Sequence, residues 1–294
     1  MFLDMLMNEP EKLLTIGGWD PCGAFGVATD LKTFAALDCH GMGVMTVVTA
    51  QNSMGWYGAE FMSADFVSQQ LDAVLGDYGA TSVKTGFLGR VDLIETIAAK
   101  LIEYEVKNII VDPVLVNNHG RAMFSQKVVD AYQKHLFPLA AVITPNRREF
   151  NLLLTGNTDP WGANLDDSIT ASGIHIDEAL AFIQQCGKEN GPPPAFVIKG
   201  LPLPKENGLI ADGLISHGMI ELFPHTQIQT KNVSGTGDSF SAALCCQLAF
   251  GLPLSKAVKL ASNLTFQAIE QGSGWQLATN AGPIAHSSFR NYSL

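Results

Sequence analysis

The residues best suited to chemistry lie in a short run around two glycines, Asn232–Phe240, with the sequence NVSGTGDSF. Gly235 and Gly237 admit backbone conformations that other residues avoid, and they let backbone amides come close to a ligand. The run leads into an apolar segment, and a helix N-terminus presents unpaired N–H groups and a positive dipole end to an anion. It therefore predicts an anion hole for a phosphate oxygen at Gly235, Thr236 and Gly237.

Asp238 follows this anion hole directly, in the first turn of the expected helix. The nearby amides and the helix dipole favour the charged form of a carboxylate at that position. Such a carboxylate can accept the proton of an alcohol whose oxygen attacks phosphorus, while the anion hole takes up the charge of the transferred group. Two interpretations of the tetrapeptide stay open: a phosphoryl-transfer site with Asp238 as its base, and a helix start with an acid in its first turn.

The segments that must position this run alternate between strand-like and helix-like patterns. Short apolar runs predict strands at Leu13–Ile16, Val44–Thr49, Ser82–Lys84, Asn108–Val111, Ala141–Thr144 and Phe196–Lys199. Helical periodicity predicts helices at Ala24–Leu37, Ala64–Leu75, Leu93–Tyr104, Gln126–His135, Asp177–Gly187, Gly237–Phe250 and Leu254–Gln271, with Ser63 and Ser125 as N-caps. The alternation indicates an α/β fold whose mostly parallel central sheet is flanked by helices. Leu209–Ser216 and Met219–Phe223 predict an antiparallel hairpin near the C-terminal third.

The bulk composition bounds the domain organisation. With 294 residues and 47% apolar content, the chain can form one large α/β domain or two small ones. No compositional break marks a second domain, so we expect an extension over residues 1–12 and a single domain over 13–294. Residues 155–173 lack periodicity and predict a long surface loop, either a lid or an inert insertion.

Charge and cysteine content exclude several classes of partner. The formal net charge of -10, with 18 Lys and Arg residues spread thinly, disfavours nucleic acid as a partner. No signal-peptide pattern or membrane-length apolar stretch is present in the sequence, so we expect no membrane partner. The five cysteines form no CxxC pair and are typical of reduced thiols in a cytoplasmic protein.

Several short motifs along the chain match those of one known family in order and spacing. The motifs are Leu14–Pro21, Ala28–Phe34, Thr49–Asn52, Val83–Gly89, Val111–Val114, Ile143–Glu149, Val197–Gly200 and Gly235–Asp238. In this colinear set the chain resembles the hydroxymethylpyrimidine and phosphomethylpyrimidine kinases of thiamine synthesis, within the ribokinase superfamily. The resemblance runs from about residue 13 to about residue 272, and it is more specific than any single motif.

The resemblance implies a three-layer α/β/α ribokinase-like fold with nucleotide and substrate at the C-terminal edge of the sheet. It also implies ATP with Mg²⁺, assigning Asn146 and Glu149 to the metal and its waters, and Asp112 to a place near the metal and phosphates. Lys199 matches the family lysine that places a positive charge on the ATP phosphates. Taken without the family, Glu149 is a first-turn acid of a helix and Asp112 a turn residue.

The family pocket would place Gly18, Asp20, Phe25, Gln51 and Phe87 around a flat heteroaromatic alcohol. The amide of Gln51 could pair with an aminopyrimidine edge, or it could simply bond to backbone. The aromatic rings could stack on the substrate or merely fill core volume.

The chain also departs from the family pattern. The thiamine-pathway kinases usually carry cysteine where Asp238 stands, and a second glycine where Leu201 stands. Aspartate at that position is typical of sugar kinases and of many pyridoxal kinases in the superfamily. The leading hypothesis is a kinase for hydroxymethylpyrimidine. Whether the chain also phosphorylates the monophosphate stays open.

Three alternatives accompany this hypothesis. The nearest is a kinase for pyridoxal, pyridoxine or pyridoxamine. A nucleotide- or vitamin-binding protein without turnover is disfavoured because binding alone does not require a base. An NAD-dependent dehydrogenase is disfavoured because no GxGxxG follows the first strand. Homodimers are common in the resembling family, but the sequence has no independent interface signature, so the oligomeric state stays open.

Overall fold

The structure is a computed structural model that describes residues 9–117, 120–156, 176–187, 191–203 and 208–291. A nine-stranded sheet with the order β3-β2-β1-β4-β5-β6-β7-β8-β9 runs through the molecule. The strands are β1 (Lys12–Trp19), β2 (His40–Asn52), β3 (Gly55–Phe61), β4 (Ser82–Thr85), β5 (Ile109–Val111), β6 (Val142–Ile143), β7 (Ala195–Pro202), β8 (Leu209–Ser216) and β9 (Met219–Thr226). β2, β1, β4, β5, β6 and β7 pair in parallel, whereas β3, β8 and β9 are antiparallel to their neighbours.

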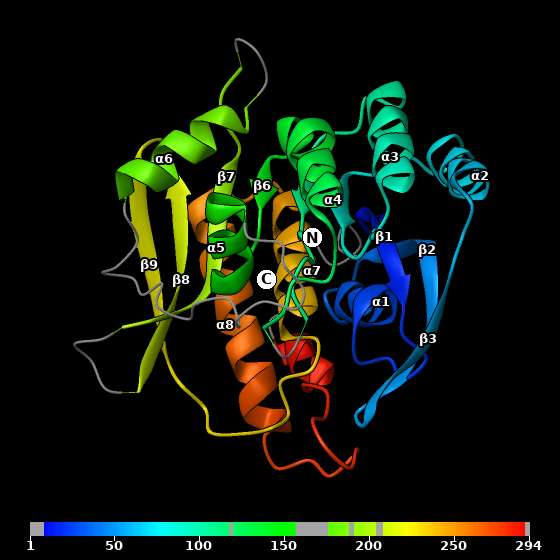
Figure 1. The fold of residues 1–294 in the computed structure, drawn as a ribbon. Helices are drawn as coiled ribbons and strands as arrows, with labels where there is room; N and C mark the ends of the chain where they lie inside the picture. The colour runs from blue at the N-terminus through cyan, green and yellow to red at the C-terminus, as the bar shows by residue number, and fades with distance from the viewer. Residues whose placement is uncertain (1–8, 118–119, 157–175, 188–190, 204–207, 292–294) are drawn as a thin grey trace, which may run out of the picture.

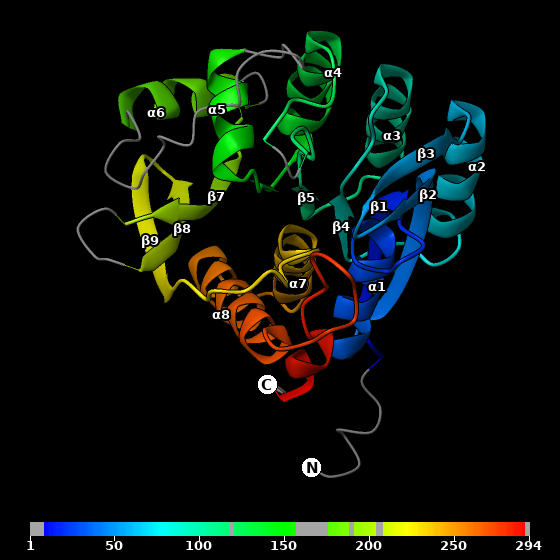
Figure 2. The same cartoon turned by 60° about the horizontal axis from the view of Figure 1, so that its bottom comes forward.

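Helices cover both faces of this sheet, which confirms the predicted three-layer α/β/α architecture (Figures 1 and 2). One layer contains α2 (Ala64–Leu75), α3 (Val91–Glu103), α4 (Gln126–Ala131), α5 (Arg147–Thr155) and α6 (Ile176–Gln185). The other contains α1 (Gly26–Ala36), α7 (Thr236–Ala249) and α8 (Leu254–Gly272), followed by a 3₁₀ segment over His286–Asn291. None of the helices in the described ranges has the length and apolar character needed to cross a membrane.

Side chains of the central strands point alternately to the two faces of the sheet and form two cores, one on each face. Leu14 and Ile16 of β1 pack with the α2–α6 layer, whereas Leu13 packs with the layer of α1, α7 and α8. Successive side chains of a strand point to opposite faces, so both faces of a covered parallel strand must be apolar. This requirement explains why the central strands appear in the sequence as continuous apolar runs.

Among the strands and α-helices, β3 was not predicted, and α5 was predicted without its bounds. β3 was missed because Gly55–Phe61 contains two glycines and its residues are exposed or only partly buried, so neither a clean alternation nor a continuous apolar run marks it. The start of α5 was expected because Glu149 fits the first turn of a helix, but its nine residues are too few to display helical periodicity. β2 also extends to Asn52, beyond the predicted Val44–Thr49.

Local capping matches the prediction in part. Ser63 accepts a hydrogen bond from the Phe66 N–H and caps α2, as predicted. Ser125 occupies the N-cap position of α4 without a side-chain hydrogen bond. The predicted helix ending at His135 continues from α4 into a π-helical turn over Tyr132–Leu136. The predicted loop lies outside the described residues except for residues 155 and 156, which end α5.

The predicted hairpin is confirmed as β8 and β9, which extend the sheet from β7. β9 is the last strand in the sheet order, and Pro224 within it pairs with Ala211 of β8. Proline cannot donate to a ladder, so its presence fits an outer strand.

Candidate active site

The glycine turn before α7 is fixed by close backbone packing. Gly235 has a φ of 78°, a left-handed conformation that favours glycine, and it stands at the N-cap of α7. A Cβ atom on Gly235 would lie 2.1 Å from the carbonyl oxygen of Ala24, so no other residue fits. A Cβ atom on Gly237 would lie 3.1 Å from Lys199 Nζ, which brings this ammonium to the turn. The sequence-predicted turn is therefore a tight backbone cradle beside a lysine.

Thr236 differs from its predicted role in the anion hole. Its N–H and its hydroxyl both donate to the carbonyl oxygen of Val233, at 3.3 Å and 2.7 Å. The N–H groups of Gly237 and Asp238 lie in the first turn of α7, where helix geometry provides no intrahelical acceptor. The donors that suit an anion here are therefore these two amides rather than that of Thr236.

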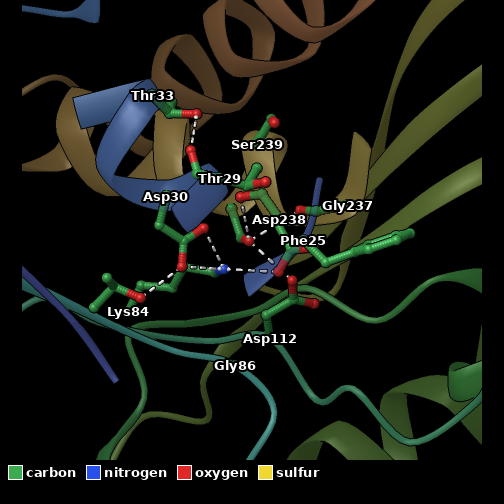
Figure 3. Close-up of polar contacts among 12 residues, drawn as sticks. Phe25, Thr29, Asp30, Thr33, Lys84, Gly86, Asp112, Gly237, Asp238 and Ser239 are labelled. Atoms are coloured by element: carbon green, nitrogen blue, oxygen red, sulfur yellow. Dashed lines mark hydrogen bonds and ion pairs between the residues drawn. The ribbon is translucent and has the colours of Figure 1, made fainter. Parts of the chain in front are cut away.

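Asp238 contacts a buried ion pair that the sequence analysis did not assign to the site. Its Oδ1 lies 3.3 Å from Lys84 Nζ, and Lys84 in turn lies 2.6 Å and 2.8 Å from the two carboxylate oxygens of Asp30 (Figure 3). The side chains of Lys84 and Asp30 are 0% and 1% exposed, whereas that of Asp238 is 14% exposed. The hydroxyl of Thr15 donates to Asp30 as well. A fully buried lysine therefore contacts the carboxylate of the expected base.

The electrostatics of this pair follow from its burial. Burial lowers the pKa of Lys84, but the carboxylates of Asp30 and Asp238 outweigh that effect and hold the pKa above its usual range. Burial raises the pKa of Asp30 to about 7, against the opposing attraction of Lys84. Lys84 interrupts a fully buried strand and Asp30 a buried helix face, and such charges in apolar segments are the signal that could have pointed to the pair.

A second lysine–aspartate pair lies beside the glycine turn. Lys199 Nζ is 2.8 Å from Asp112 Oδ1, and the hydroxyl of Ser241 in α7 donates to Asp112 Oδ2 at 2.9 Å. The side chains of Lys199 and Asp112 are 12% and 4% exposed, so this pair is slightly open. The structure therefore brings together Asp112, Lys199 and the glycine turn, as the sequence predicted.

Glu149 lies close by but is occupied by backbone donors. Its Oε2 accepts from the Asn146 N–H and its Oε1 from the Leu115 N–H, while Asn146 caps α5 by accepting from the N–H groups of Arg148 and Glu149. Burial raises the pKa of Glu149 to about 8, although Lys199 opposes this shift. Within the described ranges, no three His, Cys, Asp or Glu side chains are grouped to hold a metal. The metal role of Glu149 and Asp112 stays a prediction.

The predicted substrate residues divide between two places. Phe25, Gln51 and Asp20 line a cavity of about 1230 Å³ that also reaches Ser234 beside the glycine turn. Within it, Asp20 is turned to the backbone: its buried carboxylate accepts the N–H groups of Cys22, Ala24 and Phe25 and holds the loop before α1. Asp20 therefore shapes the cavity wall instead of offering a free carboxylate.

Phe87 and Gly18 lie outside the residues that line this cavity. The Phe87 ring packs against the rings of Trp56, Phe61 and Phe124, with centroid separations of 6.2, 6.3 and 5.3 Å. A Cβ atom on Gly18 would lie 3.0 Å from Cγ1 of Val47 and at an ordinary contact distance of 3.6 Å from the Phe87 ring, so the glycine chiefly makes room for Val47. Of the two predicted aromatic contacts, only Phe25 shares the cavity with Gln51.

Proteins of known family are similar to this chain over nearly its whole length. The family model described as phosphomethylpyrimidine kinase matches residues 20–285. The hydroxymethylpyrimidine/phosphomethylpyrimidine kinase of Bacillus subtilis (strain 168) is 35% identical over 283 residues, covering 96% of this chain and 97% of that protein. The thiamine biosynthesis bifunctional protein ThiED of Geobacter sulfurreducens is 34% identical over 93% of this chain and 52% of its own length. The solved structure of an ADP complex of Bacillus subtilis pyridoxal kinase has a TM-score of 0.79 and 29% identity, covering 97% of this chain and 100% of that one.

Proposed function

The chain belongs to the phosphomethylpyrimidine kinase family, and from this premise we propose that it transfers the γ-phosphoryl group of ATP to the hydroxymethyl group of hydroxymethylpyrimidine in thiamine biosynthesis. The observation that carries the proposal for the site is the position of Asp238. Its carboxylate stands at the start of α7, one residue after Gly237 and 3.3 Å from Lys84. A base, an anion cradle and a lysine are thereby gathered at one place.

The residues of this site divide the work of phosphoryl transfer between them. Asp238 accepts the proton of the substrate hydroxyl as the hydroxyl oxygen bonds to phosphorus. The amides of Gly237 and Asp238 stabilise the charge of the transferred group. Lys199 binds the ATP phosphates. Gln51 and Phe25 orient the ring of the substrate in the cavity.

Mg²⁺ fits the acidic side of this site. Mg²⁺ prefers oxygen ligands and is commonly held by one or two carboxylates together with substrate phosphates and water, so a full protein cage is not required. Asp112 would hold the ion, and buried Glu149 with Asn146 would order its waters; the ion would neutralise phosphate charge. Asp112 has Lys199 as its present partner, and Lys199 would move to the phosphates when they bind.

Pyridoxal phosphorylation is the second candidate, favoured by the likeness to the solved pyridoxal kinase and by an aspartate at position 238. An inactive binding protein is disfavoured because binding alone does not require a base at Asp238 beside the glycine turn. The test is ATP-dependent phosphorylation of hydroxymethylpyrimidine and of pyridoxal, with the products identified by mass. Turnover of pyridoxal without turnover of hydroxymethylpyrimidine would favour the second candidate.

The role of Asp238 is tested separately, by Asp238→Asn. We expect turnover of the alcohol to fall by a factor on the order of 10², the scale of lost general-base catalysis, with little change in ATP binding. Turnover within a few-fold of the wild type would remove Asp238 from this role.

A further inference from the structure

The ammonium group of Lys84 makes three contacts, and only two of them belong to the ion pair with Asp30. The two carboxylate oxygens of Asp30 lie at 2.6 Å and 2.8 Å, and the third contact is to Asp238 Oδ1 at 3.3 Å (Figure 3). An ammonium group has three N–H donors, so these contacts use its full capacity. Asp30 is held in turn by the hydroxyl of Thr15, which donates to it at 2.5 Å. Lys84 therefore connects β1, β4 and α1 to the first turn of α7.

Stability alone does not account for an ion pair at this position. The side chains of Lys84 and Asp30 are both removed from water, and the cost of desolvating two buried charges commonly cancels the attraction between them. Well-packed apolar residues in place of such a pair often stabilise a protein equally well or better. The third contact gives another reason for keeping the charge, because it reaches the carboxylate that we assign as the base.

We propose that Lys84 is a positioning residue that holds the carboxylate of Asp238 in the orientation needed to accept the substrate proton. The inference rests on the proposed function and concerns the same site. Lys84 acts through Asp238 and not on the substrate, because its own side chain is fully buried. Its ammonium binds Oδ1, and within the described ranges no other hydrogen bond is made to that carboxylate, so Oδ2 is left for the hydroxyl of the substrate.

The contact with Lys84 also restricts where the Asp238 carboxylate can turn. A second ammonium, that of Lys199, lies 3.1 Å from the position that a Cβ atom on Gly237 would take. Without Lys84, the Asp238 carboxylate can turn to Lys199, and the base and the phosphate-binding lysine would then occupy each other. A misplacement of about 1 Å in a site of this kind lowers turnover by a factor of about 10². The contact thus keeps both residues available for their roles.

The experiment removes the ammonium without leaving an unpaired buried charge. Asp30→Asn is compared with Asp30→Asn/Lys84→Met, so that the two proteins differ only at position 84, and urea unfolding verifies that both are folded. Kinetics are measured with an alcohol that the wild type phosphorylates. We expect kcat of the double variant to lie about 10- to 10²-fold below that of Asp30→Asn, with the KM for ATP changed by less than about twofold. A kcat within about threefold of Asp30→Asn would overturn the inference.

A mutant cycle distinguishes action through Asp238 from a general disturbance of the site. If Lys84 acts through Asp238, the loss in Asp30→Asn/Lys84→Met and the loss in Asp238→Asn should not multiply when the substitutions are combined. Losses that do multiply would show that Lys84 acts on another part of the site, and the inference would be wrong.

A matched control breaks a lysine–aspartate pair in the opposite helix layer. Lys100 Nζ of α3 lies 2.7 Å from Asp72 Oδ1 of α2, and Asp72→Asn/Lys100→Met should keep the kcat of the wild type. A loss in this control as large as that caused by the change at position 84 would assign the effect to stability and overturn the inference. A wild type that phosphorylates no alcohol would instead refute the proposed function.

Discussion

Two lysine–aspartate pairs lie near the start of α7, and they differ in their access to solvent. Lys84 and Asp30 are sealed, and the ammonium contacts both carboxylate oxygens at 2.6 Å and 2.8 Å. Lys199 and Asp112 share one contact at 2.8 Å, and 12% of the Lys199 side chain is exposed. The first pair is closed to solvent, whereas the second is slightly open, and in the proposed function Lys199 would leave Asp112 for the phosphates. We therefore expect the first pair to act mainly on stability and the second mainly on ligand binding.

The largest effect is expected where the sealed pair is broken, in Lys84→Met. Removing the ammonium leaves Asp30 buried without a counterion, which costs about 3–5 kcal/mol. The free energy of unfolding, measured with urea, should fall by that amount. The double variant Asp30→Asn/Lys84→Met is the control and should recover part of the loss, because no unpaired charge remains. A loss below about 1 kcal/mol in Lys84→Met would remove the contrast between the pairs.

A smaller effect on stability, but a large one on ATP, is expected in Lys199→Met. Asp112 keeps the hydrogen bond from Ser241 but is itself buried, so the free energy of unfolding should fall by about 1–3 kcal/mol. The specificity constant for ATP should fall about 10²-fold, because a charge that stabilises the transferred phosphates is lost. Steady-state kinetics with varied ATP checks this. If stability falls as much as in Lys84→Met, the second pair is structural too.

An effect confined to acidic pH concerns the buried side of α7, where His286 Nε2 lies 2.9 Å from the hydroxyl of Ser239. Burial, with a contribution from Lys32, lowers the pKa of His286 to about 4, from an ordinary value of 6.5. Between these values the unfolded chain binds more protons than the folded one, so stability falls as the pH drops from about 6.5 towards 4.

The measurement for this prediction is urea unfolding at several pH values. The histidine contribution should be roughly 2 kcal/mol across that window, and His286→Gln should remove it while keeping a polar partner for Ser239. A wild type and variant with the same slope would show that the buried side of α7 tolerates the charge.

The fold was largely predictable because each central strand can be recognised from a short continuous apolar run in the sequence. A strand covered on both faces must be apolar throughout, so β1, β5 and β7 are visible in the sequence without any knowledge of their neighbours. β3 was not visible, because it is held by pairing with β2 and little of it is buried. Sequence pattern thus reports burial, and elements fixed mainly by pairing escape it.

The site was predictable where one segment contains it and less so where distant segments meet. The glycine turn and Asp238 occupy four consecutive positions, whereas the roles of Lys199 and Asp112 were implied by the family resemblance. Lys84 lies 154 residues before Asp238, and only the crossing of β4 under α7 brings them together. Asp20 lines the cavity, but its carboxylate is held by three backbone donors of the same loop, a local bend that the sequence pattern did not reveal.

Pro224 affects the tendency of this chain to aggregate with copies of itself. β9 ends the sheet, and Met219 and Leu222 on it are 69% and 39% exposed. A free strand edge with apolar side chains is a template on which other chains can stack into aggregates. Pro224 removes a donor from that edge and Glu221 places a charge beside the exposed side chains. The end of the sheet is thereby guarded against aggregation, although neither residue contributes to the chemistry.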